Sequence, residues 1–168
     1  MFGWKFLSES HKQKEINRIE TDQIAFLLQE SNGIYPHKMT EPELREMFNT
    51  LRTDFNLNKT PLALLCRTDF DIRWGPSRYA ETDARAHIMM NQLPVVIIIW
   101  KYGYNDIVLL HEFAHVLQYF KHTPGQMSHG LKFKTIAQSL YLTYAHASKE
   151  YKEGLQKEYY RRKLGSYE

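Results

Sequence analysis

The chain has 168 residues, 43% of them hydrophobic and 24% charged, which is enough for one domain with its own apolar core. Its 22 basic and 19 acidic residues leave a net charge of +3, too small to indicate nucleic-acid binding by itself. The single cysteine, Cys66, excludes an intramolecular disulfide. Residues 1–5 lack the apolar stretch of a secretory signal, and no apolar run approaches the roughly 20 residues that cross a bilayer, so we expect an intracellular, cytoplasmic protein without membrane segments.

The N-terminal region is expected to be helical. Residues 9–31 form a polar amphipathic pattern with isoleucine and leucine on the inner face, and Gly33 follows as a stop signal. We assign residues 1–38 to this N-terminal helical segment. A second helix is expected to begin at Thr40, because Thr40-Glu41-Pro42-Glu43 combines a capping box with proline in the first turn.

Three or four short β-strands are predicted to follow this second helix. They are separated by turns that contain Asp, Gly or Pro. Their expected ranges are 62–67, 70–74, 84–91 and 95–100. Helix, sheet and then two more helices is the element order of a minimal zincin-like α+β domain.

The most informative feature of the sequence is His111-Glu112-Phe113-Ala114-His115, an H-E-x-x-H pattern. On a helix with 3.6 residues per turn, the two histidines lie about 40° apart on one face, with Glu112 about 60° to one side. Two imidazoles placed in this way can hold one Zn²⁺ ion, and the carboxylate can take a proton from a zinc-bound water. The pattern therefore indicates a metal-dependent hydrolase.

The sequence around this pattern supports the interpretation. Asn105 and Asp106 are cap-type residues, and an apolar helix is expected to run from there to about Lys121. In such a mostly buried helix, each histidine without a role would still need hydrogen-bond partners, which is costly. We therefore favour a metal site over two ordinary core histidines.

The third ligand can be narrowed by elimination. Residues 116–149 contain no Asp or Glu, so a carboxylate ligand about twenty residues downstream is excluded. His122 would lie about 10 Å further along the helix, beyond reach of the same ion. The metzincin spacing is excluded as well, because Gln118 and Lys121 occupy its Gly and His positions.

His129 is the predicted third ligand. It lies fourteen residues after the second motif histidine, beyond a segment, 123–128, whose proline and glycine can reverse the chain. Apolar residues recur at helical spacing over 131–144, so His129 would stand at the start of another amphipathic helix. His146 and Glu150 stay open as alternatives, although their i, i+4 spacing also suits an ordinary solvated pair.

These motifs resemble those of the SprT-like (Spartan-type) zinc metallopeptidase family. HEFAH, followed after this gap by His129-Gly130-Leu131-Lys132-Phe133, is similar to the family pattern H-E-x-x-H … H-G-x-x-F, and the resemblance covers about residues 40–147. It implies a small mixed or antiparallel sheet packed on the active-site helix, with additional N- and C-terminal helices. It also implies that residues 86–91 form an edge strand along which an extended substrate binds.

The resemblance implies a zinc-dependent endopeptidase in which His111, His115 and His129 hold Zn²⁺ and Glu112 is the general base. Because the family includes proteases of DNA–protein crosslinks, proteins bound to DNA become candidate substrates. Two alternatives stay open: a regulatory peptidase that cuts one protein partner, and a zinc-stabilised binding module without catalysis. Glu112 argues against the second, because a structural zinc site does not need it.

We assign residues 39–148 to the catalytic core and residues 149–168 to a basic, tyrosine-rich C-terminal helix or tail. Its basic and aromatic side chains could contact DNA, but its glutamates dilute the charge, and a solvated helix is the simpler interpretation. Many SprT-like proteins carry a four-cysteine zinc ribbon that contacts DNA. With only Cys66, this chain is expected to lack one.

Overall fold

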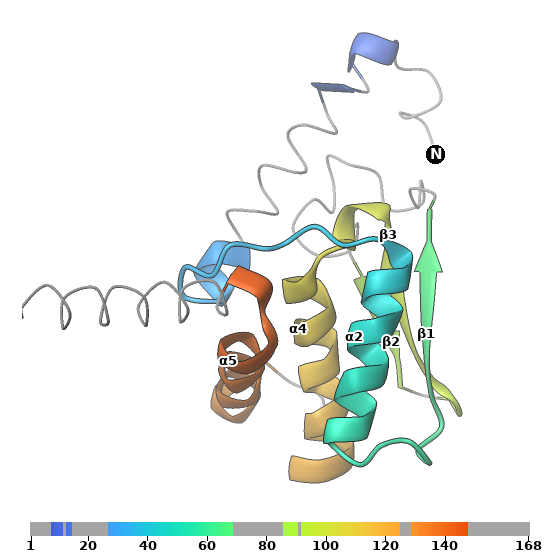
Figure 1. The fold of residues 1–168 in the computed structure, drawn as a ribbon, viewed down its shortest axis with the longest axis vertical. Helices are drawn as coiled ribbons and strands as arrows, with labels where there is room; N and C mark the ends of the chain where they lie inside the picture. The colour runs from blue at the N-terminus through green and yellow to red at the C-terminus, as the bar shows by residue number, and fades with distance from the viewer. Residues whose placement is uncertain are drawn as a thin grey trace, which may run out of the picture.

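The computed structural model describes residues 8–11, 13–14, 27–68, 86–90, 92–124 and 129–147. Its named elements are, in chain order, α2 (Glu41–Asp54), β1 (Leu62–Arg67), β2 (Ala86–Met89), β3 (Val95–Trp100), the 3-10 helix η2 (Lys101–Gly103), α4 (Asp106–Leu117), the π-helical turn η3 (Gln118–His122) and α5 (Leu131–Tyr144). They form an α+β fold, as predicted. In Figure 1, α4 stands between α5 on one side and α2 with the sheet on the other.

The strands of the described residues form one mixed sheet in the order β1-β3-β2. β3 pairs in parallel with β1 and antiparallel with β2. Leu64, Ile97 and Ile88 are aligned across the three strands, and all three are buried. One face of the sheet therefore contributes a continuous apolar row to the core. Of the two predicted arrangements, mixed or antiparallel, the described strands form the mixed one.

The predicted strand boundaries are correct for β1 and β3, whereas β2 is shorter than expected. β2 ends at Met89, which is paired with Val96. Met90, the next residue, is no longer part of the strand. Residues 84, 85 and 91, and the whole predicted strand 70–74, lie outside the described residues.

Helix α2 begins where the capping box predicts. Thr40 Oγ1 accepts a hydrogen bond from the N–H of Glu43 (3.4 Å), and Glu43 Oε1 accepts one from the N–H of Thr40 (3.3 Å). Leu44, Phe48 and Leu51 form the buried face of this helix. At about 1.5–3 kcal/mol for each fully buried side chain, this face rather than helix propensity holds α2 against α4.

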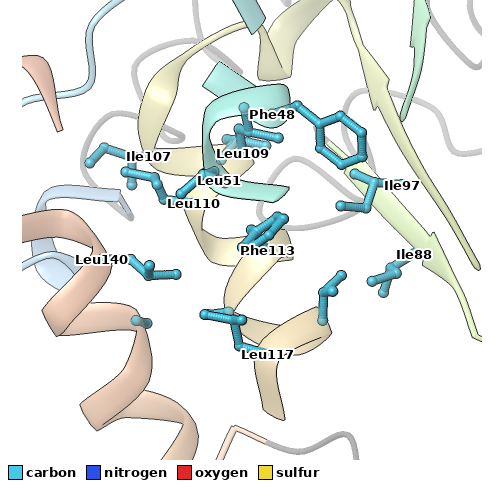
Figure 2. Packing of buried hydrophobic residues seen from close by; sticks show 14 of the residues in the cluster. Phe48, Leu51, Ile88, Ile97, Ile107, Leu109, Leu110, Phe113, Leu117 and Leu140 are labelled. Atoms are coloured by element: carbon cyan, nitrogen blue, oxygen red, sulfur yellow. The ribbon is translucent and has the colours of Figure 1, made fainter. Parts of the chain in front are cut away.

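Helix α4 is the centre of the core. Ten of its 12 residues are buried, and only His111 and Glu112 are partly exposed. Phe113 packs edge-on against Phe48 of α2 with ring centroids 6.3 Å apart, and Figure 2 shows it among the aliphatic side chains of the sheet and the helices. The predicted buried helix is confirmed, although its last turn, up to His122, is π-helical.

Of the predicted N-terminal helix, residues 9–11, 13–14 and 27–30 are described and are helical, whereas residues 12 and 15–26 lie outside the described residues. The helical residues 27–30 end in a Schellman motif in which Gly33 N–H donates to Leu28 O (2.7 Å) and Asn32 N–H donates to Gln29 O (3.4 Å). The first left-handed residue is Asn32 (φ 57°), one position before the predicted stop at Gly33. Among the residues that the structure describes, no helix combines the length and apolarity needed to span a bilayer.

Candidate metal centre

The first two histidines of the centre are held by α4. Asn105 caps this helix, because its side chain accepts a hydrogen bond from the N–H of Val108 (2.9 Å). His111 and His115 follow one turn apart, with ring centroids at 5.1 Å. Since the rest of the helix is buried on all sides, the position of both rings is fixed by the core.

The third histidine, His129, comes from the segment that leads into α5. It lies directly before Gly130, the N-cap of this helix, and α5 packs along α4. Lys132 donates from Nζ to the carbonyl oxygen of His122 (3.2 Å), which joins the first turn of α5 to the end of η3. The chain therefore returns and places His129 beside the two histidines of α4.

The Nε2 atoms of the three histidines converge. Nε2 of His129 lies 3.0 Å from Nε2 of His115 and 3.4 Å from Nε2 of His111. Nitrogen ligands at about 2.0–2.1 Å from a tetrahedral zinc ion are about 3.3–3.4 Å from one another. All three ligand atoms lie within 4.8 Å of one another, close enough to hold one metal ion.

Phe133 forms the floor of this cluster. Its ring stacks on His115 with a centroid distance of 4.2 Å and an interplanar angle of 22°. It also contacts the rings of His111 and His129, each at 5.0 Å. Phe133 is itself buried, so it restricts the orientation of all three imidazoles and keeps water away from their inner side. It is the phenylalanine of the H-G-x-x-F sequence.

The surroundings of His115 and His129 favour the neutral imidazole, the form that binds metal. Burial lowers the pKa of His115 to about 3, with further lowering by His111 and His129 and an opposing hydrogen bond from Gln118. Burial also lowers the pKa of His129. The nearby His111 lowers it further, whereas the Glu30 carboxylate acts in the opposite direction and raises it. His115 is almost completely buried, while His129 is exposed, so the cluster opens to the surface on the His129 side.

Glu30 is a member of this centre that the sequence analysis missed. Its Oε1 is in ion-pair contact with Nδ1 of His111, and the two side chains are only 18% and 15% exposed. Glu30 belongs to the last helical turn before the Schellman motif, far from the H-E-x-x-H residues in sequence. No local motif marks it, because tertiary packing alone brings it to His111.

The remaining candidate residues are placed as follows. Glu112 lies on α4 directly after His111 and is half-buried. His146, an alternative third ligand, lies elsewhere: its ring stacks on that of His37 at 3.9 Å, and its N–H donates to Asp106 Oδ2 (2.8 Å). Glu150 and the basic C-terminal segment 149–168 lie outside the described residues.

Comparisons of the chain with known protein families, curated proteins and solved structures find no match. The likeness to SprT-like metallopeptidases therefore rests on the H-E-x-x-H and H-G-x-x-F sequences. Function has to be argued from the chemistry of the histidine cluster, because a fold alone does not determine an activity.

Proposed function

We propose that this protein is a zinc-dependent endopeptidase. The observation that supports it best is the convergence of three histidine Nε2 atoms beside Glu112, a carboxylate on the helix that carries two of them. Structural zinc sites usually have four protein ligands, whereas catalytic sites have three and an open position. Three imidazoles in a cluster that opens to the surface only at His129 match the catalytic type and favour zinc over the hard, oxygen-preferring cations.

The bound ion would polarise the substrate carbonyl and lower the pKa of a coordinated water. Glu112 is the proposed general base that takes the proton of the attacking water and passes it to the leaving nitrogen. Only Glu112 and His111 of α4 are not buried, so the carboxylate stands where substrate can reach it. His111, His115 and His129 hold the ion, and Phe133 keeps their rings in place.

The proposed docking surface for substrate is β2. This strand lies at one edge of the sheet formed by the described residues, and it packs against α4. An extended peptide can add to such an edge by main-chain hydrogen bonds, which require little sequence specificity. Ile88 of β2 is buried and Met89 is exposed. One face of the strand is therefore anchored in the core, and the opposite face is open to solvent.

The test is cleavage of a histone by the zinc-loaded protein and its Glu112→Gln variant, each with and without single-stranded DNA. Loss of the general base should reduce cleavage by about 100-fold to 10,000-fold while both proteins bind one zinc ion. Glu46→Gln, the same change at an exposed position of α2, is the matched control and should cleave normally.

The DNA arm separates the candidate substrate classes. Cleavage that depends on Glu112 and rises with DNA supports a protease of DNA-bound proteins. Cleavage that is indifferent to DNA supports a general peptidase. If both proteins bind zinc and neither cuts the histone or an unfolded protein such as casein, the general endopeptidase is refuted in favour of a single-partner peptidase or a binding module.

A further inference from the structure

Glu30 engages the side of His111 that faces away from the other two histidines. Nε2 of His111 is directed at Nε2 of His129 (3.4 Å), whereas Nδ1 contacts Oε1 of Glu30. Within the described part of the chain, no other polar group is within hydrogen-bonding distance of Nδ1 of His111. The imidazole thus lies between a carboxylate on one side and the ligand cluster on the other.

Glu30 is itself held firmly in place. Its carbonyl oxygen accepts a hydrogen bond from Gln138 Nε2 of α5 (2.8 Å). Leu27 and Ser31, which lie on either side of it, are each only 1% exposed. Ser31 Oγ also donates to Ile34 O (2.9 Å), so the chain is fixed directly after the helix end. The carboxylate is therefore presented to α4 by a segment that is anchored on α5.

We propose that Glu30 is a positioning residue of the metal centre, which it serves by accepting the Nδ1–H of His111. A neutral imidazole carries one proton, and only the tautomer protonated at Nδ1 has a lone pair on Nε2 for the ion. A carboxylate at Nδ1 selects that tautomer, fixes the ring orientation and makes the ligand more basic. The inference rests on the proposed metal site and adds residues 27–34 to the structure that forms it.

The first measurement is zinc affinity, determined by competition with a chromophoric chelator. Removing such a partner of a histidine ligand weakens metal binding about 10-fold to 100-fold, and this is the loss expected for Glu30→Ala. Glu30→Gln keeps an acceptor oxygen without the charge and should fall between wild type and Glu30→Ala. Glu46→Gln, an exposed site on α2, should bind zinc like the wild type.

The second measurement distinguishes positioning from general support of the fold. Long-range ¹H–¹⁵N correlation spectra of the metal-free proteins report the tautomer of His111. The wild type should show protonation at Nδ1, and Glu30→Ala should shift His111 toward protonation at Nε2. If Glu30→Ala does not fold, Glu30→Gln, which has nearly the same volume, is compared in its place.

Each outcome decides a different question. Unchanged zinc affinity in both Glu30 variants, or an unchanged His111 tautomer in Glu30→Ala, overturns the positioning role and leaves the metal centre intact. If the wild type binds no zinc, the proposed function fails first, and the inference fails with it.

Discussion

His115 is the most deeply buried of the three histidines of the proposed metal centre. Its ring stacks on Phe133 and contacts the rings of the other two histidines, and its pKa is lowered to about 3, mainly by burial. The spacing of H-E-x-x-H predicts that His115 shares a face with His111. It does not predict its protonation state, which depends on how α5 and Phe133 cover α4.

We expect the metal-free protein to lose stability as the pH falls below about 6.5, the ordinary pKa of an unfolded histidine. Because the folded-state pKa of His115 is about 3, His115 binds a proton between about pH 6.5 and pH 3 in the unfolded chain but stays neutral in the folded chain. This residue alone makes the free energy of unfolding fall by at most about 1.4 kcal/mol for each pH unit, and the lowered pKa of His129 acts in the same direction.

Urea unfolding of the metal-free protein from about pH 7 to about pH 5 measures this slope. His115→Gln removes the titrating imidazole and should flatten the pH dependence of the free energy of unfolding. His122→Gln, at an exposed position, should leave this pH dependence unchanged. Equal slopes in the wild type and His115→Gln would show that His115 does not titrate as described.

Asp106 joins three elements of the fold. It is fully buried in the first turn of α4, where Oδ1 accepts the N–H of His37 (2.9 Å) and Oδ2 accepts the N–H of His146 (2.8 Å). The segments before α2 and after α5 are thereby tied to the start of α4.

Asp106→Asn should destabilise the protein by about 2–4 kcal/mol, because the new amide nitrogen faces a backbone donor that then loses its acceptor. The side-chain volume hardly changes, so the loss reports the hydrogen bonds and not a cavity. Urea denaturation at neutral pH measures it, with Glu46→Gln on the exposed face of α2 as the control. A loss within 0.5 kcal/mol of the control would mean that Asp106 does not join these elements.

Local signals were sufficient for most of these elements. The capping box at Thr40 predicted the start of α2, and continuous apolar residues predicted β3 and the burial of α4. Asp106 was recognised only as a cap-type residue, and Glu30 was not recognised at all. Both act on partners that are distant in sequence, and such contacts leave no periodicity or spacing to read.

At the scale of the whole molecule, the proposed metal centre brings together three separate parts of the chain. Glu30 comes from the N-terminal segment, His111 and His115 from α4, and His129 from the start of α5. A ligand that binds only the folded state adds its binding free energy to stability. Metal binding should therefore stabilise the entire described fold and not just the histidine cluster.

We expect zinc to raise the melting temperature and a chelator to lower it again. A free metal concentration of 1,000 times the dissociation constant adds about 4 kcal/mol, which corresponds to a shift on the order of 10 °C for a chain of this size. Circular dichroism melts with zinc and with EDTA measure the shift. His129→Ala should lose it, whereas His122→Ala at an exposed position should keep it. A zinc effect that persists in His129→Ala would place the ion elsewhere.

The near-complete burial of α4 also bears on which parts of the molecule could move in the proposed peptidase. Ten of its 12 residues are buried, so its amide hydrogens are expected to exchange with solvent only when the core itself opens. The two proposed ligands on α4 are therefore carried by an element that is anchored in the core. In the proposed peptidase, any adjustment to admit a peptide or release its fragments would come from the surrounding segments, on the His129 side or along β2.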